Sequence, residues 1–132
     1  MGKALADANV LIGLYRPDDG LHSRAVDLVS RLKGEGWSLV ITNLLLQEVA
    51  TVLSMRKGMA LANKFLKDYR DIIDEVIFID ENLERQAWQI FGIQEKKGTS
   101  FVDCANLAVI EKYKLGGILT FDKFYPKELR LG

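Results

Sequence analysis

Cysteine and histidine are almost missing from this chain of 132 residues, which has one of each. A single cysteine excludes a disulfide framework and any zinc or iron–sulfur site built from several thiolates, and a single histidine excludes metal sites that use a histidine pair. Proline is scarce too, because only Pro17 and Pro126 occur, near the two ends. Without repeats or low-complexity stretches, the chain is expected to form a single domain over residues 1–132.

The chain also has no excess of charge of one sign, since 18 basic and 18 acidic residues cancel. This balance excludes nucleic-acid binding by bulk positive charge alone, but it leaves room for a local basic patch. The longest stretch without a charged residue, 36–47, is too short to cross a bilayer, and Asp7 interrupts the N-terminal segment before the apolar part of a signal peptide. We therefore expect a cytoplasmic protein with no membrane partner.

Short apolar segments alternate along the chain with longer segments of helical period. The predicted strands lie at 3–6, 37–41, 76–79 and 118–120, with a weak further strand at 129–131. Each of the first four is continuously apolar, as in strands that are covered on both faces. Helices are predicted over 21–33, 43–57, 59–69, 82–97 and 100–115. This order predicts a single α/β/α domain with a central parallel sheet of four to five strands flanked by helices.

Four acidic residues stand apart from the charged surroundings of the others. Asp7 ends the first predicted strand, and Asp122 follows the fourth. Asp103 lies near the start of a predicted helix, and Glu48 lies on an apolar flank of another. Because sites in parallel α/β sheets form beyond the C-terminal ends of the strands, all four side chains can meet at one edge of the sheet.

Each of these acids also has a purely structural explanation, which is the commoner one for a single residue. Asp7 is placed to cap the next helix, and Asp122 to close an Asx turn. Asp103 follows Ser100 at the spacing of a loose capping box, and Glu48 can lie partly exposed beside the basic residues of its helix.

Together, however, four carboxylates at one edge would raise each other's pKa, and desolvation would add to the cost. A divalent cation removes this conflict. Oxygen ligands without histidine or cysteine select a hard ion, Mg²⁺ or Mn²⁺, which polarises a phosphoryl oxygen and lowers the pKa of bound water. The implied chemistry is metal-dependent phosphodiester hydrolysis.

The segments that carry these acids resemble those of the PIN-domain ribonucleases, and within that family those of the VapC-type toxins of type II toxin–antitoxin systems. The resemblance spans nearly the whole chain and depends on the order and spacing of several motifs. These motifs are Asp7-Ala8-Asn9-Val10-Leu11, Glu48 in its leucine-rich helix, Ser100-Phe101-Val102-Asp103 and Leu119-Thr120-Phe121-Asp122-Lys123-Phe124.

By this resemblance, the chain is a PIN-like Mg²⁺- or Mn²⁺-dependent endoribonuclease that hydrolyses RNA. The family's catalytic, metal-binding acids are matched by Asp7, Glu48, Asp103 and Asp122. The family's supporting residues are matched by Asn9, Ser100 and Thr120. Ala8 is a departure, because the family usually has Thr or Ser at that position. The resemblance further implies a homodimer and a cognate antitoxin that inserts a segment into the active-site groove.

Two surfaces follow from the same interpretation. Candidate contacts to RNA phosphates, which ordinary surface charge explains equally well, are Arg16, Lys123 and Lys127. The dimer surface is expected on the central helices, with Met55, Met59, Leu61 and Phe65. Because the net charge is zero, we expect single-stranded or loop RNA to be cut in preference to duplex, with a shallow salt dependence of binding.

Three alternatives remain open at this point. A PIN nuclease can process RNA without an antitoxin. A phosphoacceptor receiver domain is also a small doubly wound α/β fold, but it expects paired acids after the first strand, where Asp7 is preceded by Ala6. A non-catalytic interaction module would be favoured by the loss of one of the four acids, and none is lost.

Overall fold

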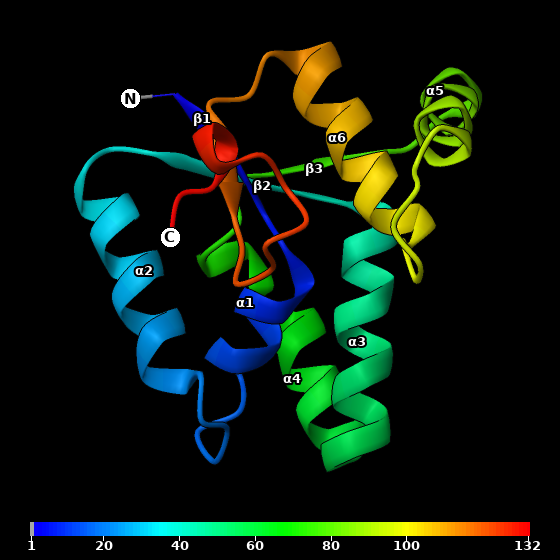
Figure 1. Cartoon of the computed structure of the whole chain (residues 1–132). Helices are drawn as coiled ribbons and strands as arrows, with labels where there is room; N and C mark the ends of the chain where they lie inside the picture. Colours follow the sequence, from blue (N-terminus) through cyan, green and yellow to red (C-terminus); the bar gives the residue numbers. More distant parts are fainter. Residues whose placement is uncertain (1) are drawn as a thin grey trace.

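Four parallel strands form the centre of the fold, which the computed structural model describes over residues 2–132 (Figure 1). They are β1 (Lys3–Ala6), β2 (Ser38–Thr42), β3 (Glu75–Ile77) and β4 (Gly117–Leu119), hydrogen-bonded in the order β3-β2-β1-β4. β1 is central, with Leu5 opposite Val40 of β2 on one side and Ile118 of β4 on the other. The predicted parallel sheet is confirmed.

Six α-helices connect and cover these strands over residues 2–132. They are α1 (Ala8–Leu14), α2 (His22–Gly34), α3 (Asn43–Lys57), α4 (Met59–Asp68), α5 (Glu81–Gly92) and α6 (Phe101–Tyr113), with short 3-10 helices at η1 (Tyr69–Asp71) and η2 (Lys127–Leu129). The connections from β1 to β2 and from β2 to β3 cross the sheet in one direction, and the connection from β3 to β4 returns. Because such crossovers are right-handed, the first two place their helices on one face and the last places α5 and α6 on the other (Figure 1). No helix within residues 2–132 is long and apolar enough to span a bilayer.

Side chains at the start of three helices explain where these helices begin. The Thr42 hydroxyl accepts a hydrogen bond from the Leu45 N–H at 3.1 Å, and the Asp80 carboxylate accepts one from the Leu83 N–H at 2.9 Å. The Ser100 hydroxyl accepts one from the Asp103 N–H at 3.1 Å. Each bond satisfies an N–H group that has no partner within its helix.

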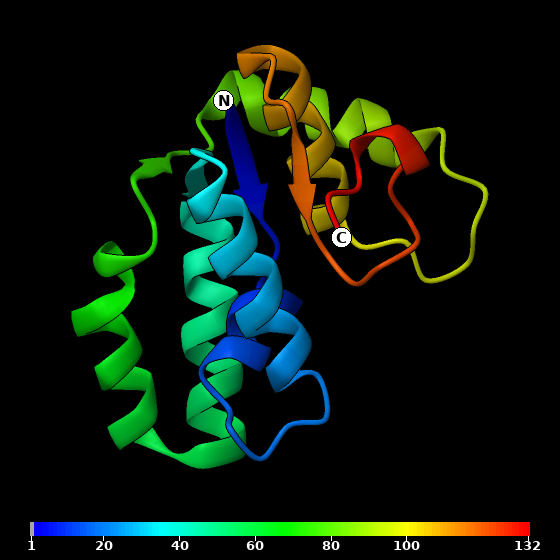
Figure 2. The same ribbon diagram turned by 90° about the vertical axis from the view of Figure 1, so that its left-hand side faces the viewer.

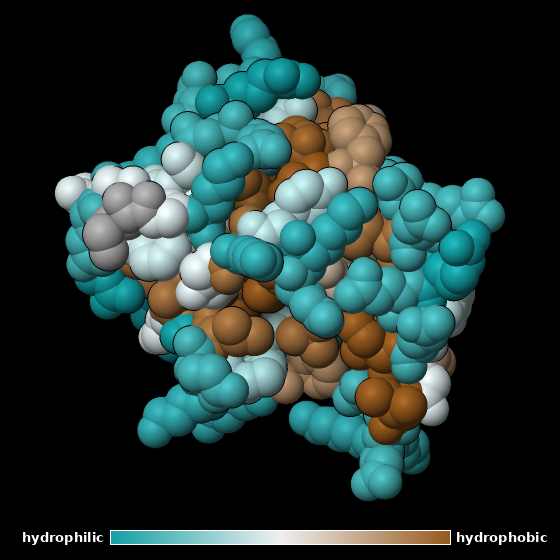
Figure 3. All heavy atoms as spheres, turned by 90° about the horizontal axis from the view of Figure 1, so that it is seen from above, coloured by the Kyte–Doolittle hydropathy of each residue, from teal (hydrophilic) through white to brown (hydrophobic). Residues whose placement is uncertain are grey.

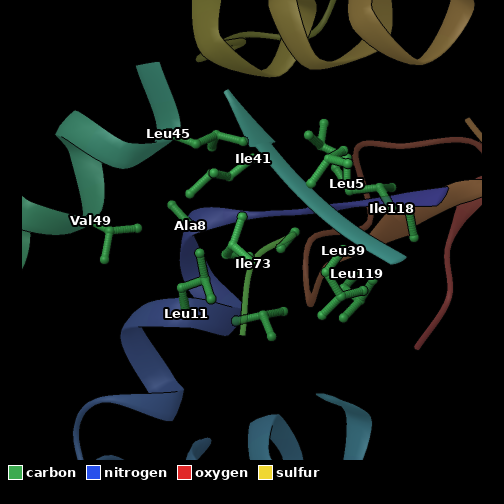
Figure 4. Close-up of a cluster of buried hydrophobic side chains, with 14 of the residues drawn as sticks. Leu5, Ala8, Leu11, Leu39, Ile41, Leu45, Val49, Ile73, Ile118 and Leu119 are labelled. Atoms are coloured by element: carbon green, nitrogen blue, oxygen red, sulfur yellow. The ribbon is translucent and has the colours of Figure 1, made fainter. Parts of the chain in front are cut away.

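The sheet is buried on both faces, as the continuously apolar strands predict. Leu5, Leu39 and Ile118, from three neighbouring strands, are fully buried. Figure 4 shows these side chains in one buried cluster with those of Leu11 and Leu45, which come from the helices that follow β1 and β2. This packing fixes the C-terminal ends of the strands, and therefore the positions of the residues that follow them.

The helix predicted over 82–97 is shorter in the structure, where α5 ends at Gly92. Glycine is a poor helix former, and the Gln94 side chain donates to the Ile90 carbonyl at 3.0 Å, which satisfies an acceptor at the helix end. Residues 93–100 form a loop instead, with Gly98 at a φ of 85°. The segment 129–131 makes only a single parallel bridge, between Ile118 and Arg130, so the predicted fifth strand is not formed.

The predicted dimer surface is exposed only in part, and Leu61 is half-buried against the core. Phe65 is fully buried and packs edge-on against Tyr15, so its inclusion in that surface was wrong. Met55 and Met59 are exposed as predicted. Further exposed apolar side chains lie on and near α5, at Phe78, Trp88, Phe91 and Ile93. Figure 3, seen from the side of α5 and α6, shows apolar side chains between polar ones.

The C-terminal segment lies against β4 so closely that position 117 has no room for a side chain. A Cβ atom at Gly117 would lie 2.5 Å from the Leu129 carbonyl oxygen and 2.8 Å from Leu131 Cγ. We therefore expect Gly117→Ala to lower the free energy of unfolding by about 1–3 kcal/mol, the usual cost of overpacking. Urea unfolding would measure this change.

Gly92→Ala is the matched control, because no heavy atom lies within 4 Å of the added Cβ. This substitution is expected to leave the stability unchanged or to raise it slightly. Equal stability of the two variants would contradict the close packing of the C-terminal segment.

Candidate active site

The strand order reverses between β1 and β4, which are neighbours although they are the first and last strands of the chain. Figure 2 shows the two strands side by side and pointing the same way. Asp7 directly follows β1, and its N–H donates to the Leu119 carbonyl at 2.9 Å, at the end of β4. Open parallel sheets form their sites beyond the C-terminal strand ends at such a reversal.

Asp7 is a buried carboxylate, with only 6% of its surface exposed. Its Oδ2 accepts a hydrogen bond from the Thr120 hydroxyl at 2.7 Å, and its Oδ1 accepts one from the Ala8 N–H at 2.9 Å. Burial, together with the charges of Asp103 and Glu48, raises the pKa of Asp7 to about 6 despite these two bonds. Asp7 is therefore an anion whose charge is incompletely compensated within the protein.

Thr120 joins the end of β4 to the start of α1. Besides donating to Asp7, its hydroxyl accepts a hydrogen bond from the Asp122 N–H at 3.0 Å. Asn9 lies beside it, with Nδ2 3.5 Å from the Thr120 hydroxyl and Oδ1 accepting from the Phe121 N–H at 3.3 Å. Asn9 and Thr120 thus fix the loop that carries Asp122 against the helix that follows Asp7.

Asp103 is oriented by two residues that the sequence motifs do not include. The Tyr125 hydroxyl donates to Asp103 Oδ1 at 2.8 Å and accepts from Asn106 Nδ2 at 2.9 Å. Asn106 is fully buried and Tyr125 is 1% exposed, and burial raises the pKa of the tyrosine hydroxyl. The one sequence signal was an amide three residues after Asp103, on the face of a helix that is otherwise apolar.

Glu48 and Asp122 complete the predicted set. Glu48 projects from α3, and partial burial together with the charge of Asp103 raises its pKa. Asp122 and Asp103 line one small cleft, and residues of the loop before α6 line its other side. Asp122 Oδ1 accepts from the Phe124 N–H at 2.9 Å, so the Asx turn that explained this residue structurally is present.

For Asp103 and Asp7, the explanation as helix-capping residues holds only in part. Ser100 caps α6 through the Asp103 N–H, but the Asp103 carboxylate turns to Tyr125 instead of completing a capping box. Asp7 occupies the N-cap of α1 and bonds only the N–H of the next residue, while its other oxygen bonds Thr120. Helix capping therefore does not account for the direction of either carboxylate.

The donor set fits a hard divalent cation in its chemistry, since it offers carboxylate oxygens that repel each other. The charge of Asp103 raises the pKa of both Asp7 and Glu48, which shows that the three carboxylates act on one another. Within residues 2–132, no three acidic, histidine or cysteine side chains are close enough in this conformation to enclose an ion. Direct ligation of one ion by three or more of these carboxylates would therefore require side-chain movement, whereas one or two carboxylates with water ligands can hold Mg²⁺.

The three predicted phosphate contacts fall into two groups. Lys123 and Lys127 line one cleft together with Asp122 and Thr120. Arg16 does not line this cleft, and it lies 3.4 Å from Asp19 and 3.6 Å from Asp18 in ion pairs. The structure thus brings two of the three cations to the acidic edge and gives the third a local partner.

Fold and site together define a doubly wound α/β domain with an acidic centre at the point of strand reversal. The chain belongs to the PIN domain family, whose model matches residues 4–127. This membership and the strand order, which differs from the 2-1-3-4-5 order of receiver-type folds, exclude the receiver alternative. A search of curated proteins finds no match to the sequence.

Two solved structures carry the comparison further. The chain is similar to Mycobacterium tuberculosis VapC20, a toxin that cleaves the sarcin–ricin loop, with 25% identity and a TM-score of 0.78 over 92% of this chain and 91% of that one. VapBC2 from Rickettsia felis, solved with a DNA fragment from its promoter, has a TM-score of 0.66 at 12% identity over 91% and 87% of the two chains and shows the fold alone. The resemblance to VapC-type PIN domains is confirmed.

The buried carboxylate of Asp7 predicts a pH dependence of stability in the metal-free protein. Its pKa is about 6 in the fold against an ordinary 3.8, so between these values the folded chain binds more protons than the unfolded chain. The free energy of unfolding therefore falls as the pH rises from about 4 to about 6, by roughly 1–3 kcal/mol from this residue, and then stays low. Asp7→Asn should remove this fall and be the more stable protein at pH 8.

Urea unfolding in EDTA at several pH values would measure the effect. Asp27→Asn is the matched control, because Asp27 is exposed on α2 and belongs to no ion pair within residues 2–132. The same slope between pH 4 and 6 in the Asp7→Asn variant as in the unsubstituted chain would contradict the assignment.

The bond from Tyr125 to Asp103 predicts a second stability effect. Tyr125→Phe leaves the amide of Asn106 buried with no partner, because Oδ1 of this residue already has none within residues 2–132. The expected loss is about 1–3 kcal/mol of unfolding free energy. Adding Asn106→Leu should recover part of it, since both polar partners are then gone.

Tyr113→Phe is the control for this pair, because the Tyr113 side chain is exposed near the end of the same helix. Thermal or urea unfolding of the unsubstituted chain, Tyr125→Phe, Asn106→Leu and the double variant completes a double-mutant cycle. Additive effects of the substitutions at 125 and 106 would show that the two side chains are not coupled.

Proposed function

We propose that this chain is a Mg²⁺- or Mn²⁺-dependent endoribonuclease and the toxin of a type II toxin–antitoxin pair, with residues 1–132 acting as one nuclease domain. The observation that carries the proposal is the buried carboxylate of Asp7 at the strand reversal, whose pKa is raised to about 6 and on which the charges of Asp103 and Glu48 act. A perturbed acid beside other acids in a cleft is a mark of a functional site. Because the chain belongs to the PIN family, we infer that the reaction at this site is phosphodiester hydrolysis.

Each site residue has a role that follows from its contacts. Asp7, Glu48, Asp103 and Asp122 would hold the ion, which when bound polarises a phosphoryl oxygen and lowers the pKa of its water. Thr120 and Asn9 orient Asp7 and the Asp122 loop. Ser100 fixes the first turn of α6, which carries Asp103. These supporting bonds keep the carboxylates turned toward one edge of the sheet.

The similar structures support the biological setting of the proposal. VapC20 is named as a toxin that cleaves an RNA loop, and its likeness covers nearly all of both chains. VapBC2 supports a protein partner for the fold. We place the activity in the cytoplasm, on RNA substrates, with the chain acting as a homodimer and held inactive by its antitoxin.

Cleavage of a mixed RNA pool tests the proposal. We expect cleavage with millimolar Mg²⁺ or Mn²⁺, none in EDTA, and a loss of about 100-fold or more in Asp7→Asn and Asp103→Asn, since each removes an ionic ligand. Thr120→Val should cost less, about 10–100-fold, as is usual for a residue that orients a ligand. Asp71→Asn is the control and should retain full activity, because Asp71 is exposed in η1 and does not line the clefts beside the acids.

Full activity of Asp103→Asn at millimolar Mg²⁺, or cleavage that continues in EDTA, would overturn the metal mechanism. The toxin assignment has its own test, because the product of a neighbouring gene should bind the chain and stop cleavage. Cleavage with no such inhibitor would leave the alternative of an RNA-processing PIN nuclease.

A further inference from the structure

A groove lined by five cations runs from the acidic edge along α2. Its first part is lined by Arg24, Lys123, Lys127 and Arg130 and opens onto Thr120 and Asp122. Its second part shares Arg24, Phe121 and Gly132 with the first and continues to Arg31. We call the surface formed by Arg24, Arg31, Lys123, Lys127 and Arg130 the basic groove. Figure 1 shows its two walls, the C-terminal segment and α2, side by side.

The cations of the basic groove are not neutralised by the protein. None of the five forms an ion pair within residues 2–132, whereas Arg16, Lys33, Lys57 and Lys64 do. Only two carboxylates, those of Asp27 and Asp122, line the groove. Asp122 already accepts a hydrogen bond from a backbone N–H. The Nε atom of Arg130 is buried without a hydrogen-bond partner in this part of the chain. The groove therefore has positive charge available for an anion.

Phe121 lines both parts of the groove. The guanidinium of Arg24 lies 4.7 Å from the centre of its ring, and this cation–π contact helps to hold the Arg24 side chain in place. Arg24 and Arg31 are seven residues apart and therefore lie two turns apart on one face of α2. The positive charges are thus spread along the groove instead of being gathered at one point.

We propose that the basic groove binds the phosphates of a single-stranded RNA on one side of the bond that is cut. This inference rests on the proposed function and adds the path of the substrate. Four carboxylates repel the phosphates that flank the reacting one, so the strand must leave the acidic edge along a surface that attracts them. The basic groove begins at Asp122 and has that property along its whole length.

A flexible strand suits this groove better than a rigid duplex does. The cations lie on both walls of a cleft that begins at the acidic edge, so the strand must bend to place one phosphate at the acids and the next ones at Lys127 and Arg24. Single strands bend in this way, and proteins hold them by cations along the backbone together with aromatic rings.

Binding of a fluorescently labelled 12-nucleotide single-stranded RNA in EDTA tests the groove without cleavage. Lys127→Gln and Arg31→Gln should each weaken binding about 3- to 10-fold and each lower the slope of log K against log salt by about 0.7–1, with additive effects in the double variant. The matched control is Lys67→Gln, on the exposed side of α4, which should change neither value. Unchanged melting temperatures would show that all variants fold.

The same variants are then assayed for cleavage with Mg²⁺. Lys127→Gln and Arg31→Gln should raise KM and leave kcat within about twofold, since they lose contacts made equally before and during reaction. The proposal is overturned if the unsubstituted chain does not bind the RNA, or if neither variant changes the slope of log K against log salt. Loss of binding to a poly-glutamate peptide, with RNA binding unchanged, would show that the groove takes an acidic protein segment and overturns the proposal.

The proposed nuclease function and the proposed RNA path can be disproved independently of each other. Salt-dependent RNA binding through the groove without cleavage by the unsubstituted chain would overturn the nuclease function alone. Metal-dependent cleavage with the same KM in all the groove variants would overturn the RNA path alone.

Discussion

The hydrogen bond from the Thr120 hydroxyl to Asp7 is the contact on which the arrangement of the site depends. It joins the ends of the first and last strands, which are neighbours only because the chain crosses the sheet twice in one direction and then returns. The apolar packing of Leu5 and Ile118 fixes these strand ends, and the one hydroxyl then serves both Asp7 and the Asp122 N–H. Removing it would free a buried carboxylate and the loop that carries another acid.

Function and stability oppose each other at this contact. Burial raises the pKa of Asp7 to about 6, so at neutral pH the fold carries a charge that it holds less well than water does. Two hydrogen bonds offset only part of that cost. A core built for stability alone would have a neutral residue here, and such destabilising residues in an otherwise well-packed fold are typical of active sites.

The sequence was sufficient for features that local patterns determine. Continuously apolar segments gave the four strands, and the acids at their ends could be found because they interrupt apolar surroundings. The bond between Asp103 and Tyr125 could not be predicted, because it depends on how the segment after β4 folds back toward α6. The segment can fold back only because Gly117 has no side chain, which lets the Leu129 carbonyl pack against it. The strand and helix periodicities of a sequence do not predict such a contact. The end of α5 at Gly92 was missed because the apolar period continues beyond a residue that ends the helix.

Net charge was the least informative of the sequence properties, because it is a sum over the whole surface. The 18 acids and 18 bases cancel, yet they are not paired evenly. Several lysines away from the site neutralise nearby acids, as Lys3 does with Glu75 and Lys64 with Asp68. The cations beside Asp122 have no such partners within residues 2–132, so the neutral chain has a local field of opposite sign to its acidic centre. A field of this kind attracts a polyanion and orients it along the groove, and it depends on which charges the fold leaves unpaired.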